Sequence, residues 1–478
     1  MSTSHAPPYP TTTATAAYPL RWLALAAVLT AEIMDLLDAT IVGIAAPSIQ
    51  ADLGGDTTVI QWIAAGYTLA FAVGLITGGR LGDLYGRRRM FLVGLVGFVA
   101  ASALCGLAVS PAMLVTSRVV QGLFGAVLIP QGFGLIKSMF PPRELGAALG
   151  SFGPAIGLSA VGGPILAGAL IAADPAGLGW PAIFLINVPI GLACLVLAWR
   201  VLPESRAEHG PRPDPVGMLL VTVGLVLFVF PLVQGRELGW PGWVFALLAA
   251  AVPVLAVFAL HQVRRSRAGR SPLVEPGLFR MRAFSGGLLV GIVFFAGMTG
   301  LILALSLHLQ LGLGFTPLAA GVTQAPWALG TAIGAVVCGA GLGRRFGRPV
   351  LQVGAVVMAA GIGVLLATLT DGQVSGWQLA PGLFICGFGM GLLVALLFDI
   401  VLAGVSLPMV GSASGVLNAN QQLGSVAGVA VLGTVFFQLF EAGDPLAAIR
   451  AVLWATAALV LLAGALALLL PRRARDEE

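Results

Sequence analysis

Three acidic residues in the first apolar segment of the chain could carry chemistry: Glu32, Asp35 and Asp38. On a helix, residues three apart cover an arc of about 120° on one face and rise by roughly 4.5 Å per step. A carboxylate at the centre of a bilayer costs at least about 2.5–3.5 kcal/mol, so this stripe must face protein or a wet cavity. A column of groups that bind and release protons is what a proton-coupled carrier needs.

The elements that position these acids are expected to be membrane-spanning helices. Hydrophobic residues make up 58% of the 478 residues and charged residues 9%, whereas a soluble domain carries about 25% charged residues. The apolar runs are too long for β-barrel strands and lack their alternation. We therefore expect an all-α polytopic membrane protein with fourteen spans of about 20 residues each. The predicted spans lie near 21–46, 59–79, 90–108, 112–137, 145–172, 182–202, 215–234, 243–263, 285–310, 317–342, 350–369, 379–403, 411–437 and 447–470.

Basic residues are distributed unequally between the two sides of this predicted topology. Of the 25 Lys and Arg residues, 22 lie on the side of the N-terminus, and the positive-inside rule places that side in the cytoplasm. Both termini are then cytoplasmic. The net charge of +5 reflects topology, so no nucleic-acid partner is expected. Arg outnumbers Lys by 24 to 1, and we expect a multi-pass protein of a bacterial cell membrane.

The predicted spans form two blocks of six, residues 21–202 and 285–470, which flank a region with two further spans, residues 203–284. Residues 1–20 are expected to be a disordered cytoplasmic tail, and residues 471–478 a second cytoplasmic tail. A weak repeat supports this division, because GGRLGDLYGRRRM follows the second span of the first block and GAGLGRRFGRP follows the second span of the last. Repeated halves with the substrate between them are a common plan for carriers.

The first of these loops contains glycines and an acid among arginines. Gly79, Gly82 and Gly86 permit close approach of helices and a sharp turn, and Asp83 can pair with Arg87 or cap a neighbouring helix. The segment resembles the loop G-x-L-A-D-R-x-G-R-K between spans two and three of the major facilitator superfamily. A leucine, Leu84, replaces the first arginine of that motif, so this chain has no charge at that place. The simpler alternative for the arginines is anchoring on the cytoplasmic side.

One arginine, Arg118, lies within the fourth predicted span. The pattern Leu114-x-x-x-Arg118-x-x-Gln121 resembles the fourth-span motif of the superfamily's proton antiporters, in which the arginine is tied to proton transfer. The alternative is a structural cation held by backbone carbonyls or by Gln121. Arg118 lies about 9 Å below the outer end of its span, a level closer to Asp38 than to Glu32.

Small residues recur along the fifth predicted span. Gly150, Gly163, Pro164 and Gly168, with a serine and an alanine in two glycine places, resemble the antiporter motif G-x8-G-x3-G-P-x2-G-G. Small residues three or four apart let helices pack closely, and a proline bends its helix. The motif distinguishes exporters from importers in the superfamily, although the same pattern is also common in ordinary helix packing.

The first span resembles a more specific signature. Residues 37–42, LDATIV, with Pro47 are similar to the L-D-x-T-I-V-N-V-A-L-P signature of the fourteen-span drug:proton antiporter family, with Gly43 in place of the asparagine. FLINVPIG at 184–191 matches that family's sixth span, and residues 415–424 match its thirteenth. The resemblance covers residues from about 21 to 470. It implies a major facilitator fold of two six-helix bundles plus two additional transmembrane helices, and multidrug efflux.

Together, the acids and the resemblance predict a proton-coupled exporter of lipophilic, cationic drugs or antibiotics. It is expected to act as a monomer in the lipid bilayer, without a cofactor or a bound metal, because the proton gradient drives it. A carboxylate could bind either a proton or a cationic substrate, so that the two compete for one charge. We rank Asp38 first for coupling, with Asp35 and Glu32 as secondary proton or substrate sites. Arg118 is expected to tune them, and Gln121 to contact substrate.

Other side chains are weaker candidates. Trp62, Tyr67 and Phe294 could line a cavity for cations, although most aromatic residues in a membrane protein only pack or lie at the interface. Asp399, near the inner end of the twelfth predicted span, could bind substrate or protons, or simply reach water. His308, at the outer end of the ninth, is expected at the membrane interface, with a proton relay as the alternative.

Two other classes of protein were weighed against this function. The spacing of Glu32, Asp35 and Asp38 resembles the acid-rich motifs by which membrane prenyltransferases hold magnesium diphosphate, but those enzymes need a second acidic cluster, which this chain lacks. We therefore do not expect an enzyme. The nearer alternative is a proton-coupled symporter or importer of a small solute, against which the fifth-span motif argues.

The predicted topology can be tested by labelling single cysteines from outside intact cells. Because the basic residues place the linkers around residues 203–214 and 264–282 in the cytoplasm, cysteines at 208 and 268 should stay unlabelled. Cysteines at 174 or 371 should react. Labelling of position 268 from outside would contradict the fourteen-span topology.

Overall fold

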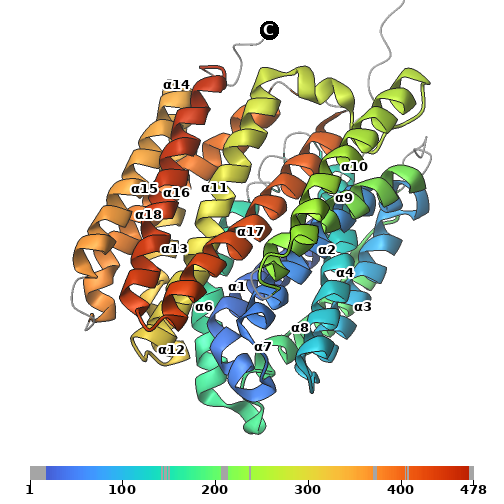
Figure 1. The fold of residues 1–478 in the computed structure, drawn as a ribbon. Coiled ribbons are helices and arrows are strands. Elements are labelled where there is room, and N and C mark those ends of the chain that lie inside the picture. Colours follow the sequence, from blue (N-terminus) through green and yellow to red (C-terminus); the bar gives the residue numbers. More distant parts are fainter. Residues whose placement is uncertain are drawn as a thin grey trace, which may run out of the picture.

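The computed structural model describes residues 18–141, 144, 148, 151–205, 214–235, 238–369, 374–403, 405 and 409–472. Every regular element in these residues is helical (Figure 1), which confirms the all-α fold. Eleven helical segments of the described chain are long and apolar enough to cross a membrane. The protein is therefore a multi-pass membrane protein, and the count of fourteen spans stays a prediction.

The first block contains seven helices in the described residues. They are α1 (Arg21–Leu53), α2 (Thr57–Tyr85), α3 (Arg87–Gly106), α4 (Pro111–Met139), α6 (Phe152–Ala173), α7 (Ala182–Leu185) and α8 (Asn187–Val201). Short polar side chains start several of them, as N-cap chemistry predicts. The carboxylate of Asp56 accepts from the backbone N–H of Thr58 at 3.0 Å, and Ser110 caps α4 through Met113.

The later helices comprise an intermediate pair and the second block. The intermediate pair is α9 (Pro215–Gln234) and α10 (Gly242–Arg267). The second block consists of α11 (Arg282–Leu307), α12 (Pro317–Thr323), α13 (Ala325–Val337), α14 (Gly343–Phe346), α15 (Arg348–Thr368), α16 (Gly376–Ala403), α17 (Val410–Glu441) and α18 (Pro445–Leu466). A π-helical turn, η3 (His308–Gly312), extends α11.

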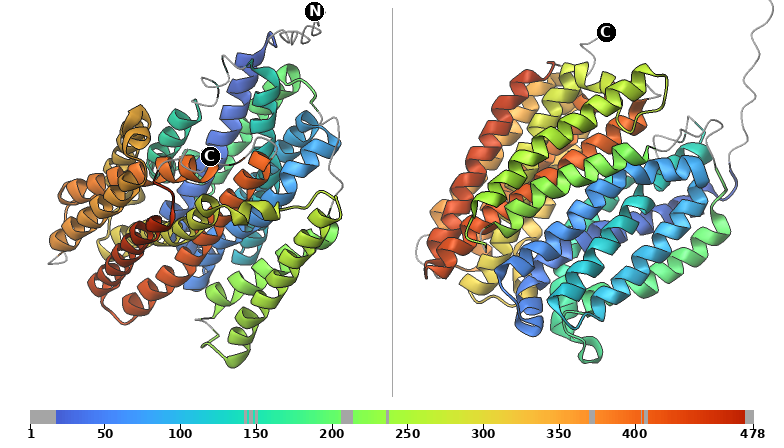
Figure 2. Two further views of the ribbon diagram at one scale, coloured as in Figure 1. Left: turned by 90° about the horizontal axis from the view of Figure 1, so that it is seen from above. Right: turned by 45° about the vertical axis from the view of Figure 1, so that its right-hand side comes forward.

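The two blocks pack in the same pattern. In the first block α1 packs against α6 and α8, and α4 packs against α2 and α3. In the second block α11 packs against α17 and α18, and α16 against α13 and α15. The blocks lie side by side, with the pair α9 and α10 at the edge of the molecule (Figure 2). This internal repeat places α1 and α11 in equivalent positions, so the acid stripe of α1 lies near the middle of the molecule.

The blocks meet through α2 with α17 and through α6 with α12 and α13 (Figure 1). Small residues of α6 make this second contact possible. A Cβ atom at Gly168 would lie 2.5 Å from Cα of Leu318, and one at Gly321 would lie 2.3 Å from the carbonyl oxygen of Pro164. A Cβ at Gly163 would overlap the side chain of Thr40 on α1. The fifth-span glycines are thus contact points between helices, whereas Gly150 lies outside the described residues.

The loop between α2 and α3 is held by backbone contacts. Gly86 adopts φ of 100°, a conformation that favours glycine, and ends α2 while it starts α3. Arg87 donates from Nη1 to the carbonyl of Gly134 at 3.1 Å. Gly82 lies against the side chain of Gln131, and Gly79 has more room beside Pro130. This loop therefore joins α2, α3 and α4, while the side chain of Asp83 lies outside the described part of the structure.

A buried acid, Asp214, joins α9 to α10 and to the segment that follows α10. Its carboxylate accepts from the backbone N–H of Gly217 at 3.0 Å, from His261 Nε2 at 2.8 Å and from Gln262 Nε2 at 3.0 Å. Gln262 in turn accepts from the N–H of Leu273 at 2.6 Å. Burial raises the pKa of the Asp214 carboxyl, but the hydrogen bonds from His261 and Gln262 outweigh it and leave the pKa below its usual range.

Replacing Asp214 by Ala should loosen this junction, because it removes the N-cap of α9 and the anchor of Gln262. We expect faster amide hydrogen exchange at residues 215–218 and 271–274. Because the folded-state pKa is lowered, the stabilisation is present above the ordinary aspartate pKa of about 3.9 and is lost as pH falls. As a matched control, Asp444→Ala removes another N-cap aspartate and should affect only the start of α18. Unchanged exchange in Asp214→Ala would contradict this role.

Candidate functional site

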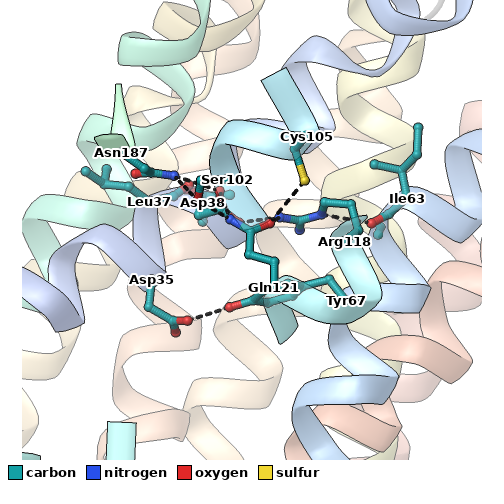
Figure 3. A network of polar contacts seen from close by, with 12 residues as sticks. Asp35, Leu37, Asp38, Ile63, Tyr67, Ser102, Cys105, Arg118, Gln121 and Asn187 are labelled. Carbon is teal, nitrogen blue, oxygen red and sulfur yellow. Dashed lines mark hydrogen bonds and ion pairs between the residues drawn. The ribbon is translucent and has the colours of Figure 1, made fainter. Parts of the chain in front are cut away.

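Asp38 lies at the centre of a polar network inside the first block, with none of its surface exposed. Helix α1 carries it, α4 supplies Arg118 and Gln121, and α8 supplies Asn187. Figure 3 shows these side chains pointing toward one another between the helices. All three partners are at least 97% buried. The network therefore joins three helices at one point.

Three donors of this network converge on the carboxylate of Asp38. Arg118 forms an ion pair with one carboxylate oxygen of Asp38, and Nη1 of Arg118 also donates to Gln121 at 2.6 Å. The other carboxylate oxygen accepts from Gln121 Nε2 at 2.9 Å and from Asn187 Nδ2 at 3.0 Å. The hydroxyl of Ser102 on α3 accepts from the same amide of Gln121 at 2.8 Å. These donors satisfy both side-chain oxygens of Asp38.

Arg118 has further contacts that fix its orientation. Its Nε donates to the carbonyl of Ile63 on α2 at 3.2 Å. Its guanidinium lies 4.2 Å from the ring centroid of Tyr67 and 5.6 Å from that of Phe184, in the arrangement of cation–π contacts. A guanidinium stays charged in proteins, so a partner carboxylate is needed here. The predicted depth of Arg118, near Asp38, agrees with this geometry.

Asp35 occupies a different environment one turn away. It is 7% exposed and accepts a hydrogen bond from the hydroxyl of Tyr67. A Cβ at Gly125 on α4 would lie 3.0 Å from the Asp35 carboxylate, so the glycine leaves room for it. Tyr67 thus contacts Asp35 through its hydroxyl and Arg118 through its ring (Figure 3). Glu32, the first acid of the stripe, is half-buried.

Several candidate residues lie away from this network. Trp62 donates from Nε1 to Gln234 at 2.8 Å and so contacts the intermediate helix α9. Phe294 is fully buried in α11, in edge contact with its neighbouring phenylalanine. Asp399 is exposed on α16. His308 is 2% exposed, so protein covers its side chain, and its place at the depth of the membrane interface stays a prediction.

Sequence reasoning missed two members of the network, Asn187 and Ser102. Asn187 is an amide within the apolar run FLINVPIG, and the argument that singled out Arg118 applies to it as well: a polar side chain at that depth needs a partner. Nothing in the sequence indicated a partner for Ser102, because the hydroxyl of a serine can form a hydrogen bond with the backbone of its own helix. The described residues contain no group of three His, Cys, Asp or Glu side chains placed to hold a metal ion.

Two blocks of helices that pack in the same pattern, with a buried charged network in the first, define a class of membrane carrier. The chain belongs to the Major Facilitator Superfamily, whose family model matches residues 28–429. It is a transporter and not an enzyme.

Curated relatives narrow the class. The chain is 55% identical to the "Probable actinorhodin transporter" of Streptomyces coelicolor, over 88% of this chain and 73% of that protein. It is 36% identical to the "Tetracenomycin C resistance and export protein" of Streptomyces glaucescens, over 87% and 76%. A solved bacterial homologue of the lysosomal transporter Spinster shares the fold, with a TM-score of 0.66, 16% identity, and 94% and 97% of the two chains covered. The similarity to these relatives supports the conclusion that the chain is a drug efflux transporter.

Replacing Arg118 by Ala should leave the Asp38 carboxylate buried without its counter-charge. Breaking a buried ion pair in this way costs about 3–5 kcal/mol, so we expect a lower unfolding temperature in detergent and loss of transport. Arg118→Lys keeps the charge but not the planar fork that reaches Asp38, Gln121 and Ile63, and should give an intermediate result. The exposed Arg450 provides a control, since Arg450→Ala should change stability by about 0.5 kcal/mol or less. Wild-type stability and transport in Arg118→Ala would contradict this interpretation.

Proposed function

We propose that the protein exports lipophilic, cationic small molecules in exchange for protons, as a fourteen-span antiporter with both termini in the cytoplasm. The observation that carries this proposal is the fully buried pair of Asp38 and Arg118 beside two further acids on the same helix face. An efflux transporter needs only a binding site and two alternating states. A buried carboxylate with one cationic partner adds a group that could exchange this partner for a proton or for a cationic substrate.

The coupling follows from competition for that carboxylate. While Asp38 is ionised, Arg118, Gln121 and Asn187 hold it in place. A proton on Asp38 removes the charge that these donors bind, so the contacts between α1, α4 and α8 weaken. Because proton binding and the packing of three helices depend on one charge, each protonation state favours its own arrangement of helices. Release of the proton on the cytoplasmic side restores the pair.

The remaining acids give a place for the charge of the substrate. Asp35 has one side-chain donor, Tyr67, whereas Asp38 has three. Asp35 and the half-buried Glu32 therefore have fewer hydrogen bonds from protein side chains than Asp38 has, and are better suited to bind a cation. We accordingly assign substrate charge to these two acids and coupling to Asp38.

The fourteen-span topology is supported by the positions of the helices. Each of the fourteen predicted ranges overlaps one α-helix or two consecutive α-helices. The three ranges without a qualifying apolar segment contain α1, α6, and α12 followed by α13. Helix α1 carries the three acids that lower its apolar character, and it packs inside the first block, where Asp35 and Asp38 have protein partners. An even number of spans places both termini on one side.

The roles of the acids can be tested in proteoliposomes with an imposed pH gradient and a fluorescent lipophilic cation. Asp38→Asn keeps the size of the side chain but cannot ionise, so we expect proton-driven transport to be abolished with the protein still inserted. Glu32→Gln and Asp35→Asn should change selectivity, with dications affected more than monocations, because fewer carboxylates remain to balance their charge.

The control is Asp174→Asn, which changes an exposed acid at the end of α6 and should retain coupling. Normal proton-driven transport in Asp38→Asn, with coupling lost in Glu32→Gln or Asp35→Asn, would reverse the assigned roles. Movement of substrate in the same direction as protons would instead show a symporter.

A further inference from the structure

His308, in the described part of the second block, is a buried imidazole that the proposed function does not use. It lies where α11 passes into the π-helical turn η3, and 2% of its surface is exposed. Neither ring nitrogen has a hydrogen-bond partner within the described part of the chain. Buried polar groups are nearly always paired, so an exception calls for an explanation. π-helical turns also occur frequently at functional sites.

The imidazole is packed tightly against its own turn and the start of α18. A Cβ atom at Gly312 would lie 2.8 Å from Nδ1 of His308, so the ring occupies space that only a glycine leaves. The carbonyl of Pro445 on α18 lies near the ring but outside hydrogen-bonding geometry. A neutral imidazole has one N–H donor, and leaving this donor unpaired in the protein interior is unfavourable. A charged imidazolium, with two donors, would be stabilised still less by these surroundings.

The charged groups on α11, α17 and α18 lie at exposed positions. The end of α17 carries Glu441, the N-cap of α18 is Asp444, and α18 itself carries Arg450. All three are exposed. Helix α12, which also contacts η3, has no ionisable residue, and the one on α11, Arg282, lies at its opposite end. A proton on His308 would therefore require the turn to move toward water or toward a new acceptor.

The same turn also joins the two blocks. Gln310 donates from Nε2 to the backbone carbonyl of Ile44 on α1 at 3.0 Å. One turn earlier, Ser306 lies against Gly43 of α1, since a Cβ atom there would be 3.9 Å from the serine hydroxyl. Pro47 lacks the N–H that would bond the Gly43 carbonyl, so this part of α1 is already weakened as a helix. Movement of η3 thus changes a contact between the blocks directly.

We propose that His308 is a second proton-binding site, and that its protonation releases η3 from α1 and α18 and so separates the two blocks at this end of the molecule. This rests on the proposed function, in which protons drive the cycle and this end faces the acidic side. A ligand shifts an equilibrium only by its different affinity for the two states. The proton has different affinities for the two states here. In the closed state the imidazolium has no hydrogen-bond acceptor, whereas in the open state water can accept from it.

Double electron–electron resonance in nanodiscs can test this proposal. Spin labels on Ala173→Cys and Ala442→Cys mark exposed positions at the ends of α6 and α17, one in each block, while the native cysteines are buried. As pH falls from about 8 to 5, the range in which histidine titrates, the wild type should show a several-fold rise in the population with long distances. His308→Gln and His308→Phe, one polar and one apolar, should both lose this rise.

Two comparisons separate this inference from the proposed function. His261→Gln removes a histidine at the other end of the membrane region, beside Asp214, and should keep the wild-type response. Asp38→Asn should lose proton-driven transport yet keep the response. The inference is overturned if the wild type shows no pH response, or if both folded His308 variants keep it. In either case the transport assay in proteoliposomes decides independently whether protons drive export.

Discussion

The buried ion pair between Asp38 and Arg118 is the interaction on which the arrangement of the first block depends. Neither charge could remain at this depth alone, because an isolated buried ion costs several kcal/mol. Together they are fully enclosed, and Gln121 and Asn187 satisfy the second carboxylate oxygen. The requirement fixes the rotation of α1, α4 and α8 about their axes. Apolar packing alone would permit many rotations of such helices, since lipid does not penalise an exposed leucine.

Contacts between the blocks are of another kind. They rely on small residues and backbone groups, as where Gly168 meets Leu318 and where Gln310 donates to the Ile44 carbonyl. Such contacts are close but carry no buried charge, so separating them exposes mainly groups that water or lipid can accommodate. The charged network instead lies within one block, and no ion pair among the described residues joins the two. The blocks are therefore suited to move as units while the network holds the first one together.

The sequence was sufficient for the helices and for part of the site. Long apolar runs leave the backbone no partner but itself in a membrane, so helix positions could be predicted from composition and length. The pairing of Arg118 with Asp38 could be predicted from depth, because the rise of a helix per residue is constant. The depth of a residue in the membrane does not show how its helix is rotated about its axis, however. The sequence alone therefore could not place Asn187 beside Asp38 or Tyr67 beside Asp35. The position of His308 near a helix end likewise did not show that η3 and α18 cover its side chain.

Three acids that look equivalent in the sequence are distinguished by what the neighbouring helices present to them. Asp38 faces an arginine and two amides, Asp35 faces one phenol, and Glu32 is only half-buried. The number of side-chain partners rises along one helix face from Glu32 to Asp35 to Asp38. The three carboxylates therefore differ in how readily each could exchange a protein partner for a cation or a proton. Tyr67 contacts both Asp35 and the guanidinium that holds Asp38. A change of charge at Asp35 therefore reaches Asp38 through two side chains, which is the physical requirement for one binding event to influence the other.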